Sequence, residues 1–339
     1  MSQPVALEVV NAVKHYVTPS RGEVHALDGV SVRVEVGDVL GVVGESGCGK
    51  STLARLMVKL EAPDQGSVRL FDEPFNEPAR AWAPWRRGGA SRLSQQSRRA
   101  VQLVFQDPYA SLDPRQRVDD AIAEVLRVHG LPGSAEQLIE LVGLPMSVVG
   151  KYPHQLSGGQ RQRIGIARAL AVEPKVLVLD EPVSALDVSV RAEIINLLER
   201  LRRDLSLTYV FISHDLGMVR HLSDRIAVMY LGKIVEYGPW QQVSDHPLHP
   251  YTRALQAAIP IADPELDERA SPASIVGEVP DASNPPPGCR FAPRCPIAEA
   301  RCATEEPPLA PTPDGGVLAC HVVARSLSAP TGPVTEAAR

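Results

Sequence analysis

Nine consecutive residues match the pattern of a phosphate-binding loop. Residues 44–52 read Gly-Glu-Ser-Gly-Cys-Gly-Lys-Ser-Thr and fit G-x-x-x-x-G-K-[ST]. Glycines let successive backbone N–H groups point at one anion, and a following helix adds free N–H groups and the positive end of its dipole. We expect Lys50 to reach the β- and γ-phosphates of a nucleotide and Ser51 to ligate Mg²⁺. The other candidate nucleotide-binding residues of the loop are Gly44, Ser46, Gly47, Cys48, Gly49 and Thr52.

Two carboxylates follow an apolar run later in the chain. Residues 176–179 read Val-Leu-Val-Leu, which is typical of a buried parallel strand, and Asp180 and Glu181 come directly after it. Ligands of open α/β sheets bind at the carboxyl edge of the strands. In a chain with a phosphate loop, Asp180 is therefore a candidate Mg²⁺ partner, and Glu181 could orient or deprotonate a water. A strand expected at 208–213 delivers His214 to the same edge, where a catalytic and a structural role both remain open.

A second stretch has the features of an anion site at a helix start. Residues 156–160 read Leu-Ser-Gly-Gly-Gln, and a helix is expected to run from there to about residue 171. Ser157 is the expected N-cap, and the paired glycines allow another backbone or a ligand to approach closely. The chain thus carries two candidate anion sites.

Periodicity locates the elements that must position these residues. Residues 39–43 are expected to form the strand that feeds the phosphate loop, and Leu53, Leu56, Met57 and Leu60 have helical spacing after it. Further strands are predicted at 30–36 and at 101–105, and the second of these is followed by Gln106. Helices are predicted over 118–144, with a break at 130–133, and along a helical face from Ile194 to Leu205. A hairpin is predicted at 226–237 around Gly232.

Two features leave two interpretations open. Tyr16 lies among polar residues and fits either a strand-end aromatic or a platform on which a nucleobase stacks. Residues 73–100 have the character of a surface insertion, which fits either a solvated loop or a surface for an anionic partner. Its arginines are Arg80, Arg86, Arg87, Arg92, Arg98 and Arg99.

Composition bounds the class of protein. The chain has 339 residues, 35 basic and 40 acidic, and a formal net charge of −5, which does not indicate a nucleic-acid-binding surface. No apolar run approaches the ~18 residues of a spanning helix, and the N-terminus has no signal-peptide pattern. We therefore expect a cytosolic or peripheral membrane protein.

The composition shifts near residue 258, where prolines become frequent and an irregular appendage rather than a second α/β domain is expected. We expect a nucleotide-binding domain over 1–257, the appendage over 258–325 and a disordered tail over 326–339. Four of the five cysteines lie in the appendage, with five, six and seventeen residues between them: Cys289, Cys295, Cys302 and Cys320. This spacing lacks the paired knuckles of zinc modules and is compatible with a cubane iron–sulfur cluster.

These motifs, in this order and spacing, resemble the ATPase cassette of ABC transporters. The Leu-Ser-Gly-Gly-Gln signature at 156–160 discriminates this family from other phosphate-loop ATPases. The stretches 104–115 and 246–252 look like the ATPase subunits of dipeptide, oligopeptide and nickel importers. The resemblance covers about residues 6–323 and implies an α/β fold, with a RecA-like parallel-sheet core, an antiparallel β subdomain and a helical subdomain that carries the signature.

The resemblance also implies a role for each matching residue. Tyr16 would stack on adenine, and Lys50 would bind the phosphates. Mg²⁺ would be held by Ser51, Gln106 and Asp180. Glu181 would be the general base, assisted by His214 at the γ-phosphate, so that the catalytic set is Glu181, His214, Gln106 and Lys50. Ser157, Gly159 and Gln160 would bind the nucleotide of the opposite subunit, with Asp187 near the seam.

Because one chain cannot complete its own site, the family pattern implies that two cassettes close head to tail around two ATP molecules. A heterodimer with a second ABC ATPase is favoured over a homodimer. The implied partners are two transmembrane permease subunits and, indirectly, an extracytoplasmic substrate-binding protein. The chain would be a Mg²⁺-dependent, transport-coupled ATPase at the cytoplasmic face of the membrane, importing dipeptides, oligopeptides, nickel or related small solutes.

Alternatives stay open at two points. The importer ATPases that this chain resembles have a matching cysteine pattern, and some carry a 4Fe–4S cluster there; zinc, with His321 as a further ligand, unligated thiols or disulfides are the other options. For the whole chain, the alternative is a soluble ABC ATPase that acts as a switch on ribosomes or DNA. Against it stand the single cassette and the lack of a sustained heptad run.

Overall fold

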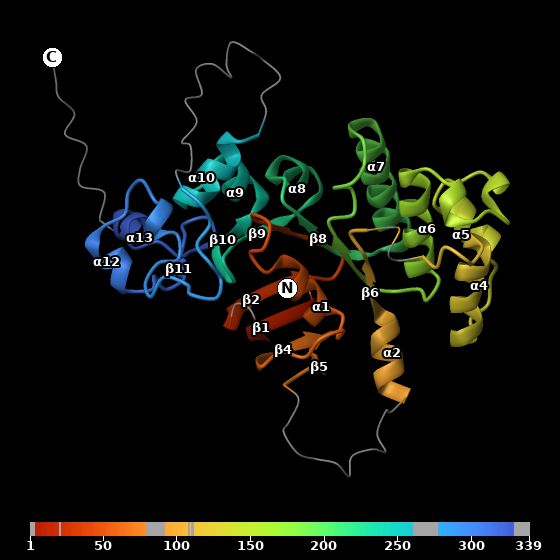
Figure 1. Ribbon diagram of the computed structural model, residues 1–339, viewed down its shortest axis with the longest axis horizontal. Helices are drawn as coiled ribbons and strands as arrows, with labels where there is room; N and C mark the ends of the chain where they lie inside the picture. Colours follow the sequence, from red (N-terminus) through yellow and green to blue (C-terminus); the bar gives the residue numbers. More distant parts are fainter. Residues whose placement is uncertain are drawn as a thin grey trace, which may run out of the picture.

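Two β-sheets with one helix between them organise the chain (Figure 1). The computed structural model describes residues 4–19, 22–78, 92–107, 109, 112–259 and 277–328. The smaller sheet is antiparallel, with strand order β2 (Gly22–Glu35), β1 (Val5–Thr18), β4 (Gln65–Leu70) and β5 (Glu73–Asn76). The larger sheet has the order β11 (Ala310–Pro311), β12 (Val317–Leu318), β10 (Lys233–Pro239), β9 (Arg225–Tyr230), β3 (Val39–Val43), β8 (Thr208–Ser213), β7 (Val176–Asp180) and β6 (Val101–Val104).

The centre of the larger sheet is parallel. β3, β7 and β8 are buried along their whole length, as their continuous apolar sequences predict for strands covered on both faces. β3 pairs in parallel with β8 and β9, and β7 pairs in parallel with β6 and β8. The carboxyl ends of β3, β6, β7 and β8 therefore meet at one edge of the sheet. The α/β class and the predicted parallel core are confirmed.

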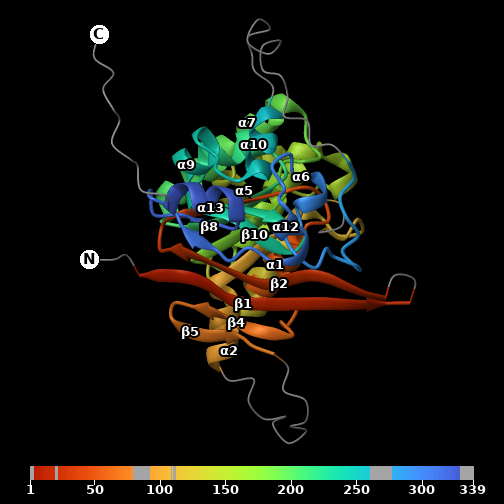
Figure 2. The same ribbon diagram turned by 90° about the vertical axis from the view of Figure 1, so that its left-hand side faces the viewer.

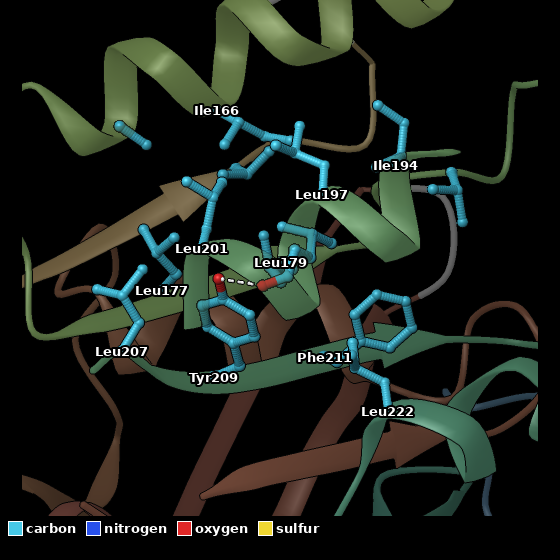
Figure 3. Packing of buried hydrophobic residues seen from close by; sticks show 14 of the residues in the cluster. Ile166, Leu177, Leu179, Ile194, Leu197, Leu201, Leu207, Tyr209, Phe211 and Leu222 are labelled. Atoms are coloured by element: carbon cyan, nitrogen blue, oxygen red, sulfur yellow. Dashed lines mark hydrogen bonds between the residues drawn. The ribbon is translucent and has the colours of Figure 1, made fainter. Parts of the chain in front are cut away.

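Helices cover both faces of this sheet. α1 (Lys50–Met57) lies between the two sheets, where Leu53, Leu56 and Met57 are fully buried. The opposite face carries α6 (Gly158–Leu170), α7 (Val188–Leu205) and α8 (Leu216–Leu222). In Figure 3 the side chains of Ile194, Leu197 and Leu201 pack on those of Leu177, Leu179, Tyr209 and Phe211. Each fully buried aliphatic side chain stabilises the fold by roughly 1.5–3 kcal/mol.

A separate group of helices carries the start of α6. α4 (Val118–His129) and α5 (Ala135–Leu141) are joined where the sequence predicts a break, and they lie with α6 at the right of Figure 1. Gly130 ends α4 in the left-handed region with φ 62°, and Ser134 opens α5 with a capping box to Gln137. The short 3₁₀ helices η1 (Met146–Val148) and η2 (Pro153–Gln155) lead into α6.

The structure corrects two details of the helical predictions. α1 ends at Met57, so Leu60 does not continue its buried face and is 59% exposed. Likewise, Leu205 at the end of α7 is 40% exposed, while the earlier leucines of that face are buried. The helical period of the sequence continues past Met57, although α1 ends there and Lys59 adopts φ 58°. It likewise continues past Leu201, the last buried leucine of α7.

The region predicted as an insertion contains regular structure at both ends. β5 pairs with β4 over Glu73–Asn76, and α2 (Arg92–Ala100) leads directly into β6. The residues between, 79–91, lie outside the described part of the chain.

The C-terminal extension, residues 277–328, packs on the cassette beside β10. Its elements are η3 (Ala292–Arg294), α12 (Ala300–Thr304), the strands β11 and β12, and α13 (His321–Ser328). β12 pairs antiparallel with β10 and so extends the main sheet. Figure 2 views this side, with the long β1–β2 pair below α12 and α13. α13 includes residues 326–328, which we expected to be disordered; the rest of that predicted tail, 329–339, is not among the described residues.

Two further helices, α9 (Trp240–Asp245) and α10 (Pro250–Ala257), connect β10 toward the extension. Within the residues that the structure describes, no helix combines the length and the apolar character needed to cross a membrane.

Candidate functional site

The predicted phosphate loop joins β3 to α1, so the strand and helix that the motif requires are both present. Gly49 has φ 106°, and a Cβ atom there would lie 2.2 Å from the carbonyl oxygen of Ala26. A Cβ atom on Gly44 would lie 2.2 Å from the carbonyl oxygen of Met229. Only glycine fits these two positions, because the loop is pressed against neighbouring backbone.

Lys50 is 4% exposed and lies at the centre of the loop. Its Nζ donates to the carbonyl oxygens of Gly44, at 2.8 Å, and Glu45, at 3.1 Å. Its Nζ also lies 3.7 Å from Oε1 of Glu181. The ammonium group is thereby held where the loop meets the carboxylate that follows β7, which suits contact with a bound phosphate.

Ser51 and Asp180 meet at the same edge of the sheet. The Ser51 hydroxyl donates to Oδ1 of Asp180 at 3.2 Å, and the residues are 129 positions apart in the sequence. Burial raises the pKa of Asp180 and the charge of Glu181 adds to this, while the hydrogen bond from Ser51 opposes it. A hydroxyl and a buried carboxylate form the oxygen donor set that Mg²⁺ prefers.

Glu181 is the meeting point of the remaining catalytic candidates. Its Oε2 accepts from Nε2 of Gln106 at 3.3 Å and lies 3.1 Å from Nδ1 of His214. Its backbone has φ 45°, in the left-handed region that a residue with a side chain rarely adopts. Such strain is typical of functional positions, since the surrounding fold must maintain it. The structure thus brings together Lys50, Ser51, Gln106, Asp180, Glu181 and His214.

Tyr16 lies within β1, two positions before the carboxyl end of that strand. Its hydroxyl donates to Glu61. Burial and Glu61 raise the pKa of Tyr16, and a hydrogen bond with Thr52 opposes the rise. The tyrosine is thereby joined to the first turn of α1, close to the phosphate loop, and its proposed stacking on a base stays a prediction.

The signature residues form a separate site. The Ser157 hydroxyl accepts from the Gln160 backbone at 3.3 Å, and Oε1 of Gln160 accepts from the Ser157 backbone at 3.0 Å, a reciprocal capping box. A Cβ atom on Gly159 would lie 2.5 Å from Cγ1 of Val190, so this helix start packs closely on α7, whose N-cap is Asp187. Among the hydrogen bonds between described residues, none joins this group to the phosphate loop.

Sequence reasoning missed two residues that hold the phosphate loop. The Tyr251 hydroxyl accepts from the Glu45 backbone N–H at 2.8 Å. Arg294, 249 positions away, donates to both carboxylate oxygens of Glu45, at 2.8 and 3.1 Å. The available sequence signals were the His246–Thr252 stretch and the position of Arg294 directly before Cys295; neither indicates a contact with the loop.

The four cysteines of the extension are gathered in one region without a disulfide. The Cys289 N–H donates to the carbonyl oxygen of Cys302 at 2.8 Å. Burial raises the pKa of Cys289 to about 11, and the charges of Cys302, Cys295 and Cys320 add to this. Within the described chain, no three of these sulfurs lie within 4.8 Å of one another. A tetrahedral zinc site, with Zn–S about 2.3 Å, would require separations of roughly 3.8 Å.

A groove of about 460 Å³ opens beside Gln106, between the sheet and the signature helix. Its wall includes residues 101–105, of which Phe105 is 42% exposed, and Val125, Gln162 and Ala169 from the helical group. An exposed aromatic residue at the edge of such a groove is typical of a surface that receives another protein.

Known protein families and individual proteins match this chain over most of its length. Residues 27–184 match the ABC transporter family, and residues 235–302 match the oligopeptide/dipeptide transporter C-terminal region. The chain is 47% identical over 292 residues to the oligopeptide transport ATP-binding protein OppF of Escherichia coli, which covers 84% of each chain. It is 46% identical over 305 residues to the di/tripeptide transport ATP-binding protein DppF of Pseudomonas aeruginosa, covering 88% of this chain and 90% of that protein.

Solved structures agree. The ATP-binding cassette MJ0796, solved as a dimer in a post-hydrolysis state with ADP and Pi, superimposes with a TM-score of 0.59 at 26% identity. That match covers 69% of this chain and 98% of MJ0796. CbiO1 of Clostridium perfringens, part of the ABC transporter complex CbiONQ, gives the same TM-score over 72% of this chain and 92% of CbiO1.

Proposed function

The chain belongs to the oligopeptide and dipeptide transport ATP-binding proteins of the ABC transporter family, and we propose that it energises the uptake of short peptides. It is an ATP-hydrolysing subunit of an ABC importer. Support for peptides as the cargo comes from the named functions of its relatives. Nickel or a related small solute is the alternative cargo. The relatives reported are transport proteins, so the action on ribosomes or DNA is not favoured.

One observation supports the proposed residue roles above all others. Lys50, Ser51, Asp180, Glu181 and His214 converge at the carboxyl edge of β3, β7 and β8, although they lie on separate parts of the chain. Lys50 binds the phosphates, and Ser51, Gln106 and Asp180 would hold Mg²⁺, which neutralises phosphate charge when bound. Tyr16 stacks on the adenine.

Glu181 acts in this proposal as the base that accepts a proton from the attacking water. His214 holds the Glu181 carboxylate through its 3.1 Å contact and is placed to touch the γ-phosphate. Catalysis arises mainly from positioning and electrostatics, because phosphoryl transfer leaves little covalent chemistry for the protein.

The second half of the site is proposed to come from another subunit. Ser157, Gly159 and Gln160 cap α6 among themselves and make no described hydrogen bond to the phosphate loop of their own chain. A second ABC ATPase, most simply a non-identical one, would present its signature residues to this chain's nucleotide and receive the same in return. Asp187, at the neighbouring helix start, would lie near the seam.

Membrane partners complete the proposed machine. We assign the groove beside Gln106, with Phe105 at its wall, to a short cytoplasmic helix of a permease subunit. Two such permease subunits, fed by an extracytoplasmic substrate-binding protein, would place the chain at the cytoplasmic face of the membrane. The ATP-driven closure of two cassettes then supplies the conformational change for alternating access.

The experiment that tests the residue roles is the Glu181→Gln variant, assembled with its permease and partner ATPase. Gln keeps the size and hydrogen bonding of the side chain but cannot accept the proton, so we expect turnover to fall by about 100-fold or more. ATP binding should persist, and the ATP-bound dimer should accumulate. Unchanged turnover would remove Glu181 from the role of base.

We further propose that the four cysteines hold a 4Fe–4S cluster. The proposal is supported by the grouping of the four thiols, of which no three described sulfurs lie within 4.8 Å of one another, and by a sequence spacing without the paired knuckles of zinc modules. The group would fasten the proline-rich extension.

Iron, acid-labile sulfide and zinc content of anaerobically purified protein tests this assignment. About four irons and four sulfides per chain would support it. About one zinc without iron, or neither metal, would contradict it and leave the ATPase assignment intact.

A further inference from the structure

Glu45, the second residue of the phosphate loop, is held from three directions. Its backbone N–H donates to the Tyr251 hydroxyl at 2.8 Å, and its carbonyl oxygen accepts from Nζ of Lys50 at 3.1 Å. Its carboxylate accepts from Nη1 and Nη2 of Arg294 at 2.8 and 3.1 Å. The path of the loop at Glu45, and with it the position of the Lys50 ammonium, thus depends on residues outside the loop.

The contact with Arg294 has the geometry of a strong ion pair. The Arg294 side chain is 7% exposed and the Glu45 side chain 25% exposed. The guanidinium meets both carboxylate oxygens, the two-point arrangement that fixes direction as well as distance. Nη1 also donates to the Tyr230 hydroxyl at 3.2 Å. Separating the pair would leave the buried guanidinium without its counter-charge, so the contact with Arg294 restrains the position of Glu45.

Arg294 belongs to the cysteine-bearing segment, residues 289–295. Cys295 follows it directly, and Cys289 lies just before η3. Phe291, in the same segment, is 1% exposed and packs edge-on against Tyr230 with ring centroids 5.2 Å apart. It also lies 5.5 Å, centroid to centroid, from Tyr251, whose hydroxyl binds the Glu45 backbone. The segment therefore contacts Glu45 directly through Arg294 and packs, through Phe291, against the tyrosine that makes a second contact.

We propose that Arg294 is a positioning residue of the ATP site: through Glu45 it keeps the phosphate loop in its nucleotide-binding shape, so that nucleotide affinity depends on the cysteine-bearing segment. This inference rests on the proposed nucleotide role of Lys50 and the loop. It requires neither a particular cargo nor a particular metal. The extension is then part of the ATP site, in addition to any role of its cysteines.

Binding of a fluorescent ATP analogue, N-methylanthraniloyl-ATP, to the full chain tests the proposal. Arg294→Met keeps the length of the side chain and removes the ion pair, and Glu45→Gln weakens the pair from the other side. We expect each to raise the Kd about tenfold, within the range typical of coupling between sites. The double variant should be no weaker than Arg294→Met alone, because both changes remove the same interaction. Arg294→Lys should fall between, since an ammonium cannot contact both oxygens in the same way.

Glu306→Gln is the matched control. Glu306 pairs with Lys233 at 2.5 Å and also joins the extension to the cassette, but neither of these two side chains has a described hydrogen bond or ion pair with residues 44–52. The Kd of the Glu306→Gln variant for the analogue should stay within about twofold of that of the unaltered chain. If loss of any ion pair between the extension and the cassette weakened nucleotide binding, Glu306→Gln and Arg294→Met would both raise the Kd. Folding of each variant is checked by circular dichroism and thermal unfolding.

The outcomes separate this inference from the proposed function. If the unaltered chain fails to bind the analogue, the nucleotide-site assignment fails. If the unaltered chain binds it and folded Arg294→Met and Glu45→Gln bind it equally well, only the positioning role of Arg294 is overturned. Additive effects of the two substitutions would also overturn it, because independent residues add.

Discussion

Nδ1 of His214 lies 3.1 Å from Oε2 of Glu181, and the two residues follow the neighbouring parallel strands β8 and β7. The Glu181 side chain is 11% exposed, whereas that of His214 is 52% exposed. The histidine is therefore the solvent-facing member of the pair, and the carboxylate lies behind it.

This relationship predicts the effect of His214→Ala. Loss of the imidazole leaves Glu181 without one of its orienting contacts, so we expect ATP turnover to fall by about 100-fold while nucleotide affinity changes little. His221→Ala, an exposed histidine in the last turn of α8, is the control and should retain full activity. Steady-state ATPase assays with nucleotide titrations provide the measurement. A folded His214→Ala protein with normal turnover would show that the contact is not used in catalysis.

The proposed role of the signature residues predicts that the same substitution at two N-caps, Ser157 and Ser134, will affect ATPase activity differently. Ser157→Asp keeps an acceptor for the capping box and adds a negative charge where a partner's γ-phosphate is proposed to bind. We expect ATPase activity of the assembled dimer to fall by about 100-fold. The free energy of unfolding should stay within about 1 kcal/mol, because Asp is also a good N-cap.

Ser134→Asp supplies the control for this comparison. Ser134 makes the same capping box at the start of α5, with Gln137 in place of Gln160. The substitution changes charge and cap chemistry in the same way, at a helix start without a proposed phosphate contact. Equal losses of activity in both variants would indicate a general effect of charge and would remove the composite-site interpretation.

His249 predicts a loss of stability in acid. It is 1% exposed, and burial lowers its pKa to about 3, with Arg253 acting in the same direction; Glu236 binds its backbone N–H. The unfolded histidine takes up a proton near its ordinary pKa of 6.5, so the unfolded state binds more protons between pH 6.5 and about 3. This group should therefore cost about 1.4 kcal/mol of stability for each pH unit below 6.5.

His249→Asn tests the assignment. Asn keeps an acceptor for the Tyr251 N–H at the start of α10 but has no titrating group. Urea unfolding at about pH 6.5 and 5.5 should show a smaller loss for the variant than for the unaltered chain. An identical pH slope would assign the acid sensitivity to other residues.

His15 predicts the opposite pH dependence. Burial lowers its pKa, but hydrogen bonds with Asp28 and Glu23 outweigh this and raise it; His25 and Arg290 also contact Asp28. Since the folded pKa is raised, its contribution to stability is complete below 6.5 and is lost as pH rises through the folded pKa.

We therefore expect His15→Gln to reduce the free energy of unfolding more at about pH 6 than at about pH 8.5. His154→Gln, which alters an exposed histidine in η2, should show no such difference. Urea unfolding of both variants at the two pH values provides the measurement. A His15→Gln effect that does not vary with pH would indicate that the histidine is neutral in the folded protein.

The amino-acid sequence alone determined those features that depend only on residues close together in the chain. The loop at 44–52 requires glycine where backbone approaches backbone, and the strand patterns at 39–43 and 176–180 reflect burial on both faces. The capping box at Ser157 is likewise a matter of residues three positions apart. Parallel strands share one carboxyl edge, so even the convergence of Asp180 and His214 with the loop was predictable.

Tertiary structure alone decided contacts that depend on how distant surfaces meet. The pairing of Glu45 with Arg294 across 249 positions, and of β12 with β10, leaves no periodic or local signal in the sequence. Leu60 shows the same limit, since its helical spacing predicts burial but α1 ends at Met57 and the Leu60 side chain is 59% exposed. Side-chain periodicity reports which face of an element is apolar; only the packed fold determines what lies against that face, and how far it extends.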